Sequence, residues 1–376
     1  MLEGGGFVTT SRPFATIESA IEAIRLGQMV VVVDDEDREN EGDLTLAAAH
    51  ISPETINFMA THGRGLICVA MEGELLDRLH IPMMVRDNSS PFETAFCISV
   101  EAKNGTTTGI SAADRALTVQ TLIDPASKPY DFVKPGHMFP LRARPGGVLT
   151  RTGQTEASVD LARLAGLHPS GVICEIMNED GTMARVPDLI PYCERHGLLM
   201  VTVADLVDYR LHKETLVEPL ESRGLQTTWG ALTAHRFRSM LDGGTHLAFV
   251  LGDLSGPPPL VRVHLESLPE DLLGFGAGDQ AGSGGLFHAA MDAIAREGRG
   301  VLVYLRRHGH TLGVVDEGSP APSLMNDRDF GVGAQILRQL GIHEMRLLSR
   351  SEKKYIGLRG FGLDIVATVP LETPAP

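Results

Sequence analysis

The sequence is poor in cysteine, in aromatic residues and in long apolar runs. Only four of its 376 residues are cysteines, and aromatic residues make up 5%. No two cysteines form a CxxC pair, so free thiols in a reducing compartment are expected. The absence of any run of about 18 apolar residues argues against a membrane-spanning helix. The opening residues, MLEGGGFVTTSRPF, lack a basic segment before an apolar run, so we expect no signal peptide and a cytoplasmic protein.

Positive charge is scarce as well. The formal net charge is −15, which argues against binding to nucleic acid and against anionic membrane surfaces. A small phosphorylated substrate is compatible with this charge, because it needs only a local group of basic side chains. The charge therefore favours a small molecule rather than a polyanion as the partner.

Length and periodicity predict two α/β domains. A chain of 376 residues with 43% apolar residues is too long for one ordinary core. In the first half, apolar spacing predicts helices and strands in alternation. The expected helices are 15–27, 53–61, 155–165 and 187–196, and the expected strands are 29–33, 44–49, 65–70, 171–176 and 199–203.

The second half shows a similar alternation after a charged stretch at 207–224, where the periodic pattern weakens. We therefore predict mixed α/β sheets in two domains, residues 1–212 and 213–376. The expected strands are 247–251, 261–265, 301–305 and 345–348, and the expected helices are 287–296 and 333–340. The glycine-rich segment 274–285 is predicted to be a loop, and residues 371–376 a frayed tail.

One acidic segment stands between two apolar strands. Residues 34–43, DDEDRENEGD, contain seven carboxylates around a single arginine. A solvated loop is one interpretation. In an extended chain, however, alternate residues share a face, so Asp37, Glu39, Glu41 and Asp43 could converge on a hard cation such as Mg²⁺. Arg38 could instead hold a phosphate or a carboxylate.

This segment resembles the signature of the 3,4-dihydroxy-2-butanone 4-phosphate synthase family. Four further motifs follow in the same order, and the resemblance covers roughly residues 14–211. They are GISAADR (109–115), KPGHMFPLRA (134–143), PGGVLTRTGQTEA (145–157) and GVICEIMNEDGTMAR (171–185).

The resemblance implies a lyase that acts on a sugar phosphate. In that family, ribulose 5-phosphate is enolised, loses water, rearranges and expels C4 as formate, with Mg²⁺ or alternatively Mn²⁺ as cofactor. The matching positions imply metal binding by Glu39 and Gln154 and catalysis by His137, Glu175 and Asp43. The implied substrate-binding residues are Arg38, Glu39, Asp43, Thr108, Arg151, Thr152, Gly153, Gln154, Thr155 and Glu175. The family also implies a homodimer with shared sites.

Some of these residues could instead have a purely structural role. His137 could cap or pack beside Pro135–Gly136, whereas a carboxylate at Glu175 within an apolar strand is costly to bury unpaired. The start of the helix at 155 is suited to an anion, although Thr152 or Thr155 could simply cap it. Cys68 matches a position near the site and is expected to be a packed strand residue.

Gln154 departs from the family, which usually has a histidine there. Its amide oxygen could replace the imidazole as a ligand for Mg²⁺, which prefers oxygen. Alternatively, that metal contact is lost and the activity is weak. The surrounding motif residues favour retained activity.

The second half contains VRVHLES (261–267), GRGVLVYLRRHG (298–309), NDRDFGVGAQIL (326–337), LGIHEMRLL (340–348) and GFGLDIV (360–366). With these motifs it resembles GTP cyclohydrolase II, more thinly than the first half resembles its family, over roughly residues 220–370. That family's zinc cysteines would fall on Ser267, Gly278 and Gln280, none of which supplies a thiolate. His308 and His310 form an HxH pair without a third ligand at a recognisable spacing, Asn326 replaces a usual aspartate, and Arg328 matches the proposed nucleophile. We therefore predict no zinc and no GTP hydrolysis. Two alternatives stay open: a non-catalytic regulatory or scaffold protein, and a bifunctional enzyme that also hydrolyses GTP.

Overall fold

The structure is a computed structural model. It describes residues 13–35, 38–92, 94–241, 243–267, 271, 283–306, 327–349 and 361–371. The chain divides into two compact units, Met1–Arg210 and Leu211–Pro376. The division falls inside one helix, α7 (Val203–Lys213). Each unit is described by itself below.

The first unit is built on a mixed seven-stranded sheet of order β4-β5-β3-β6-β2-β1-β7. Neighbouring strands are antiparallel except for the pairs β1–β7 and β3–β5, which are parallel. The strands are β1 (Val30–Val33), β2 (Gly42–Ala47), β3 (Cys68–Glu72), β4 (Val100–Ala102), β5 (Phe132–Ala143), β6 (Ser170–Glu175) and β7 (Leu199–Thr202).

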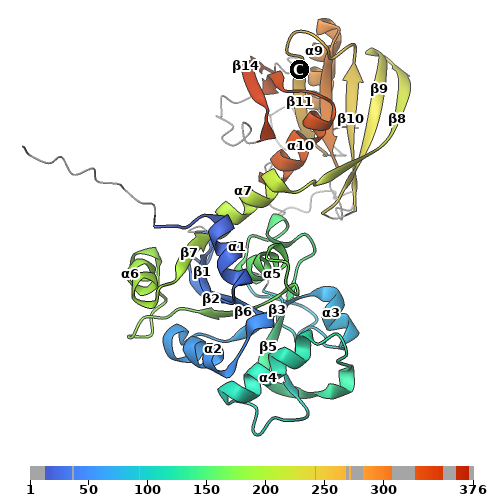
Figure 1. The fold of residues 1–376 in the computed structure, drawn as a ribbon. Helices are drawn as coiled ribbons and strands as arrows, with labels where there is room; N and C mark the ends of the chain where they lie inside the picture. The colour runs from blue at the N-terminus through green and yellow to red at the C-terminus, as the bar shows by residue number, and fades with distance from the viewer. Residues whose placement is uncertain are drawn as a thin grey trace, which may run out of the picture. The chain divides into compact units, whose positions relative to one another are not determined.

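Helices cover both faces of this sheet (Figure 1). On one face the core joins the central strands to α2, α4 and α6, and Val119 and Leu189 are fully buried there. On the other face α5 packs on β6, where Gly171 leaves room for Ser158. The helices are α1 (Ile17–Arg25), α2 (Pro53–Phe58), α3 (Gly73–Arg78), α4 (Ala112–Ile123), α5 (Gln154–Leu164) and α6 (Val186–His196).

Local chemistry explains where these helices begin. The Thr16 side chain accepts a hydrogen bond from the amide of Ser19 and caps α1, whose buried face includes Ile17 and Ile24. Ser52 and Thr55 form a capping box on α2, with Pro53 at its first position. A single π-turn, Met59–Gly63, follows α2 and leads into β3.

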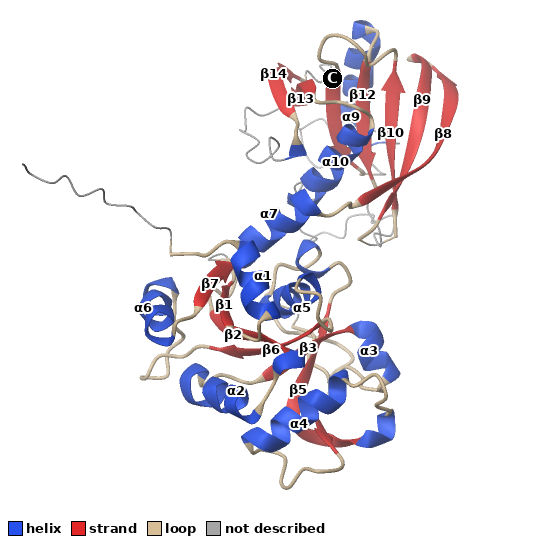
Figure 2. Ribbon diagram, viewed as in Figure 1, coloured by secondary structure: helices blue, strands red, loops and turns tan. Residues whose placement is uncertain are grey.

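The second unit has its own mixed seven-stranded sheet, of order β14-β13-β11-β12-β10-β9-β8 (Figure 2). The pairs β8–β9, β9–β10 and β10–β12 are antiparallel, and the pairs β12–β11, β11–β13 and β13–β14 are parallel. The strands are β8 (Val217–Thr227), β9 (Gly230–Ser239), β10 (Thr245–Leu251), β11 (Leu260–Leu265), β12 (Gly300–Leu305), β13 (Glu344–Ser349) and β14 (Asp364–Pro370).

Two helices lie on opposite faces of this second sheet. Helix α9 (Ser283–Glu297) shares a core with β12 through Ile294 and Leu302. Helix α10 (Asp327–Gln339) approaches the other face, where a side chain at Gly333 would contact Val263 and Leu305. In the part of the chain that the structure describes, no helix is long and apolar enough to span a bilayer.

The predicted fold class, mixed α/β sheets in two domains, is confirmed. The stretch 207–224 is nevertheless more regular than expected, because it contains the end of α7 and much of β8. Strand β8 is exposed along most of its length, so it carries no apolar alternation that could reveal it. The glycine-rich segment 274–285 and the tail 371–376 lie largely outside the described residues.

Candidate active site

Asp34 organises the acidic loop that follows β1. Its buried carboxylate accepts hydrogen bonds from the amides of Glu39 and Glu41, at 3.3 and 2.8 Å. The Arg38 guanidinium lies 2.5 Å from the same carboxylate and 2.8 Å from that of Glu39. These contacts fold the loop back on itself and hold Glu39 beside the end of the strand pair β1–β2.

The expectation of an extended acidic segment was wrong. The loop turns at Arg38 and Glu39, and Asn40 adopts a left-handed backbone with a φ of 53°. Asp37 lies outside the described residues. The remaining carboxylates still gather, since the charges of Glu39 and Glu41 both act on Asp43. A turn, and not the alternation of an extended strand, brings these carboxylates together. The amides of Glu39 and Glu41 donate to the Asp34 carboxylate and not to a neighbouring strand.

Asp43 and Glu175 form the centre of the group. They are paired residues on the adjacent antiparallel strands β2 and β6. Asp43 is 2% exposed, and its Oδ1 has no hydrogen-bond partner among the described residues. Glu175 accepts a 2.8 Å hydrogen bond from the amide of Leu66. A Cβ at Gly65 would lie 2.5 Å from the Glu175 carboxylate, so only glycine allows this approach.

Burial and like charge weaken the acidity of both carboxyls. Burial raises the pKa of Asp43 well above its usual range, and the charge of Glu175 raises it further. Burial also raises the pKa of Glu175, and the charge of Glu39 adds to the increase. Two such neighbours do not ionise independently. Each carboxyl therefore holds its proton more readily than an isolated one, and a cation nearby would favour the doubly ionised form.

Gln154 reaches the acidic loop from the start of α5. It is 6% exposed, and its Nε2 donates a 3.1 Å hydrogen bond to the carbonyl of Glu41. The amide nitrogen is thus used by the protein, and Oε1 is the atom that remains to act as a ligand. Gly153 is the N-cap, and no side chain caps the helix. The expectation that Thr152 or Thr155 caps α5 was wrong, because the helix begins at Gln154.

Two arginines meet at the segment around Phe92. The Arg38 guanidinium lies 5.5 Å from the centre of the Phe92 ring. Arg151 donates to the Phe92 carbonyl at 3.0 Å and to Thr94 Oγ1 at 3.1 Å. Its other nitrogen is 2.6 Å from the buried carboxylate of Glu156. Arg151 is thus held firmly by protein groups, and only its other N–H groups could reach a phosphate.

The start of α5 offers further groups. Thr152 is exposed, whereas Gly153 and Thr155 are buried. A Cβ at Gly153 would lie 2.4 Å from the Arg151 guanidinium, which explains the glycine. Uncapped N–H groups at a helix N-terminus attract anions. This end of α5 therefore suits an anionic group of a substrate.

His137 and Thr108 belong to a second group, at the β4–β5 edge of the sheet. His137 Nδ1 lies 2.6 Å from Glu101 Oε2, and the histidine side chain is 45% exposed. Thr108 is exposed in a turn whose neighbours, Thr107 and Gly109, donate hydrogen bonds to the buried Asp114. Among the described residues, no hydrogen bond or ion pair joins this group to Asp43 and Glu175. Strands β3 and β6 separate β5 from β2 in the sheet.

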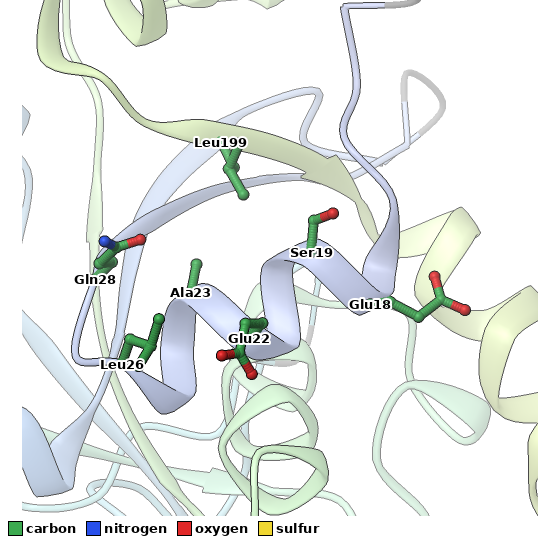
Figure 3. Close-up of a pocket in the computed structure, with 7 residues that line it drawn as sticks. All are labelled: Glu18, Ser19, Glu22, Ala23, Leu26, Gln28 and Leu199. Carbon is green, nitrogen blue, oxygen red and sulfur yellow. The ribbon is translucent and has the colours of Figure 1, made fainter.

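Within the described ranges, no three histidine, cysteine, aspartate or glutamate side chains form a ready metal-binding cluster. The hollow drawn in Figure 3 lies between α1 and β7 and is lined by none of the predicted site residues. Glu18 and Glu22 project from its helical wall and make it unsuited to a phosphate. The carboxylates of the acidic loop are thus not among the residues that line this hollow.

Four residues with clear roles in this geometry were not singled out from the sequence. Asp34 is one of seven carboxylates in the acidic segment, and Glu101 lies in the short strand β4, so neither stands out in the sequence. Arg185 donates a 2.8 Å hydrogen bond to the Glu39 carbonyl and so holds the acidic loop from outside. Asp114 anchors the Thr108 turn. The signal for Asp34 was available, since an aspartate directly after an apolar strand often accepts bonds from the amides that follow.

A buried ion pair lies behind the loop that leads into α5. Asp160 of α5 and Arg210 of α7 are 1% and 2% exposed, and their charged atoms lie 2.6 Å apart. Asp160 also accepts a hydrogen bond from the amide of Val148, and Arg210 donates one to the carbonyl of Gly146. The buried Asp160–Arg210 pair therefore holds the segment before Arg151 in place.

Cys68 is 2% exposed in β3, in the packed position that was expected of it.

The second unit contains a different buried polar group. His264 Nε2 lies 2.9 Å from Asp271 Oδ1, and Tyr304 donates a 2.7 Å hydrogen bond to Oδ2. The amide of Ser267, one of the positions where a zinc cysteine was expected, also donates to Asp271. The other two positions, with His308, His310 and Asn326, lie outside the described residues. Nothing is described of the Arg328 side chain.

Residues 18–209 match the family model of 3,4-dihydroxy-2-butanone 4-phosphate synthase, and residues 218–370 match that of GTP cyclohydrolase II. The chain belongs to the synthase family and carries a GTP cyclohydrolase II-type second domain. The expected family is thus confirmed. A riboflavin biosynthesis protein RibBA of Aquifex aeolicus is 49% identical, over 96% of this chain and 93% of the relative.

One further relative and one solved structure match almost the whole chain. A monofunctional riboflavin biosynthesis protein RIBA 2, chloroplastic, of Arabidopsis thaliana is 48% identical over 96% of this chain and 78% of its own. The crystal structure of RibBX, a two-domain 3,4-dihydroxy-2-butanone 4-phosphate synthase from A. baumannii, has a TM-score of 0.79 at 42% identity. It covers 94% of this chain and all of its own.

A synthase structure with two magnesium ions has a TM-score of 0.51 and is 42% identical. It covers 53% of this chain and 98% of its own. Since this neighbour matches about half of the chain, the fold of the first unit is similar to that of a separate synthase.

Proposed function

We propose that residues 1–212 convert ribulose 5-phosphate to 3,4-dihydroxy-2-butanone 4-phosphate and formate, in riboflavin biosynthesis. Residues 213–376 form a GTP cyclohydrolase II-like domain without that activity. The observation that carries the proposal is the buried Asp43–Glu175 pair, with an unpartnered carboxylate oxygen beside Glu39. An enzyme that must move protons next to a carbonyl needs carboxyls of this kind.

The residues present fit a divalent cation. Asp43 Oδ1 is buried and has no hydrogen-bond partner among the residues that the structure describes. Glu39 belongs to the same acidic loop, and Gln154 contacts it. We propose that Glu39 and Gln154 hold Mg²⁺, with Mn²⁺ as an alternative, because these donors are all oxygen. When bound, the ion polarises the carbonyl and hydroxyl oxygens of the substrate.

The chain's own groups supply the proton transfers. In the Asp43–Glu175 pair, one carboxylate can accept a proton from the carbon next to the carbonyl while the other keeps its proton. His137 can give a proton to the departing hydroxyl, since imidazole exchanges protons near neutral pH. The groups proposed to bind the sugar phosphate are Arg38, Glu39, Asp43, Thr108, Arg151, Thr152, Gly153, Gln154, Thr155 and Glu175.

A homodimer with shared sites would bring the second group to the first. The support is that His137 and Thr108 lie at the sheet edge, apart from Asp43 in one chain. Leu66, next to the Glu175 contact, and Ile110, next to the Thr108 turn, are 42% and 55% exposed. Mixing His137→Ala chains with Glu39→Gln chains should restore part of the activity if sites are shared. No restoration in mixed dimers of confirmed mass would contradict sharing.

The synthase proposal is tested with the purified full chain, ribulose 5-phosphate and Mg²⁺. We expect formate release that stops on addition of EDTA and returns with excess Mg²⁺. If no formate forms with either Mg²⁺ or Mn²⁺, a non-catalytic regulatory or scaffold role takes its place.

The same preparation tests the second domain. We propose that it binds no catalytic zinc and does not open the guanine ring of GTP, because Ser267, Gly278 and Gln280 supply no thiolate. We expect substoichiometric zinc and no formate from GTP, even after incubation with Zn²⁺. Stoichiometric zinc together with GTP turnover would establish a bifunctional enzyme, which is how the chloroplastic RIBA 1 relative of Arabidopsis thaliana is named.

A further inference from the structure

Glu101 and His137 form a close carboxylate–imidazole pair at the β4–β5 edge. The 2.6 Å separation of Glu101 Oε2 from His137 Nδ1 requires a shared hydrogen. A carboxylate only accepts, so the hydrogen belongs to Nδ1, and Nε2 is then the nitrogen that can take up or release a proton. The Glu101 side chain is 13% exposed, far less than that of His137 at 45%. The carboxylate is thus the fixed member of the pair.

The backbone of β5 is shaped to bring the two side chains together. Val100 pairs with Met138, whereas Glu101 pairs with Val133, so the intervening residues of β5 lie outside the ladder. Gly136 presses on the peptide between Val100 and Glu101, where a Cβ would come within 2.1 Å of backbone atoms. Any side chain at Gly136 would therefore push His137 away from Glu101.

The same carboxylate contacts the turn that carries Thr108. A Cβ at Gly109 would lie 1.6 Å from Glu101 Oε2, so the carboxylate occupies the place of a side chain there. Gly109 has a φ of 87°, which also disfavours other residues. Thr107 Oγ1 and the amides of Thr107 and Gly109 donate to Asp114, which fixes the turn from its other side.

We propose that Glu101 is a positioning residue for the synthase reaction, holding His137 in one orientation and one tautomer beside the Thr108 turn. Carboxylates that hold the far nitrogen of a functional histidine act in this way in other sites. The inference rests on the proposed function only for the role of His137 in turnover. The position and the tautomer are properties of the protein alone and can be measured without substrate.

The test uses the full chain with ¹⁵N-labelled histidine and three variants. Glu101→Ala removes the acceptor, Glu101→Gln keeps size and hydrogen bonding but not charge, and the exposed Glu194→Gln is the matched control. The His137 signals are assigned by their loss in His137→Gln. We expect the wild-type ring to carry its hydrogen on Nδ1, and Glu101→Ala to shift the ring toward the Nε2–H tautomer.

Kinetics provide the second readout. We expect Glu101→Ala to lower kcat roughly 10–100-fold, as for other lost partners of functional histidines, with KM changed far less. Glu101→Gln should recover part of kcat, and Glu194→Gln should match the wild type. Wild-type tautomer in Glu101→Ala, or a kcat equal to that of the control, overturns the proposal. If the wild type releases no formate, the synthase proposal fails, and the ¹⁵N signals alone decide whether Glu101 positions His137.

Discussion

The two units place buried carboxylates in opposite surroundings. In the first, Asp43 faces Glu175 and other acids, one of its oxygens has no partner among the described residues, and its pKa is raised. In the second, Asp271 lies among donors. Burial alone would raise its pKa, but hydrogen bonds from His264, Tyr304 and the Ser267 amide outweigh burial and lower it. Burial itself therefore does not indicate a reactive group.

The contrast separates a buried acid that hydrogen-bond donors satisfy from one that lies among other acids. A buried charge is tolerated when donors satisfy it, and it then adds to stability. A buried acid without donors destabilises the folded chain unless a proton or a cation joins it. Asp43 is of this second kind, and Asp271 is of the first, although the second domain resembles an enzyme.

The largest expected effect comes from removing the proposed metal carboxylate. Glu39→Gln keeps the side-chain shape but removes the charge that attracts the cation, so formate release should fall at least ~100-fold. Far-ultraviolet circular dichroism should match the wild type, since Glu39 is partly exposed. Glu18→Gln, on the outside of α1, is the control for charge alone. Near-normal turnover in Glu39→Gln would assign the metal to another carboxylate of the loop.

The paired acid of the second unit should matter for stability. Asp271→Asn weakens bonds to His264 and Tyr304, and we expect a loss of ~1–3 kcal/mol at pH 7. Because the folded pKa of Asp271 is lowered, its contribution is present above the unfolded value and is lost as pH falls through the folded pKa. Hydrogen exchange of β12 amides, measured relative to the wild type at pH 7 and at a pH well below the ordinary aspartate pKa of ~4, checks both. Faster exchange that persists unchanged at the lower pH would contradict this account.

The same substitution in the first unit should have the opposite sign. Asp43→Asn removes a buried like charge, so we expect Tm in EDTA to rise by about 2–4 °C, equivalent to ~1 kcal/mol, while activity is lost. The folded pKa of Asp43 is raised, so its ionisation reduces stability as pH rises above the unfolded value of ~4. The gain should thus be larger at pH 8 than at pH 5. A lower Tm for Asp43→Asn at pH 8 would show that donors already satisfy this carboxylate.

The smallest change is expected at the departure from the family. Gln154→His adds a nitrogen ligand but loses the Nε2 bond to the Glu41 carbonyl. Turnover with Mg²⁺ should stay within about tenfold, and the metal preference should shift from Mg²⁺ toward softer transition ions. Rates of formate release with each metal ion, at equal free ion concentration, measure this change in preference. A large rise of Mg²⁺-dependent activity from nearly nothing would mean that the natural glutamine impairs the enzyme.

The sequence predicted most of the helices and strands that have a regular pattern of apolar residues. It missed the strands that have no such pattern. Strand β5 contains Pro135, Gly136 and Pro140, which are residues that usually end a strand. Strand β8 is mostly exposed, and the short β4 has only three residues. Such elements are stabilised by partners distant in the sequence, and local spacing does not record those partners.

The same limit applies to the site. The adjacency of Asp43 and Glu175 follows from the register of β2 and β6, which no local pattern encodes. Motif resemblance named both residues, but it did not name Asp34 or Glu101, whose roles depend on three-dimensional contacts. Hydrogen bonds to Asp34 also explain why the acidic loop is turned, where strand alternation suggested an extended segment.

The buried Asp160–Arg210 pair has a consequence for anyone who shortens the gene. The stretch that matches the synthase family ends at residue 209, one position before Arg210. A chain stopped there would keep Asp160 and the loop before Arg151 but would lose the cation and the donor to the Gly146 carbonyl. Removing one member of a buried ion pair typically destabilises a protein by ~3–5 kcal/mol. A first domain meant to fold on its own should therefore extend past Arg210, at least to Lys213, where α7 ends.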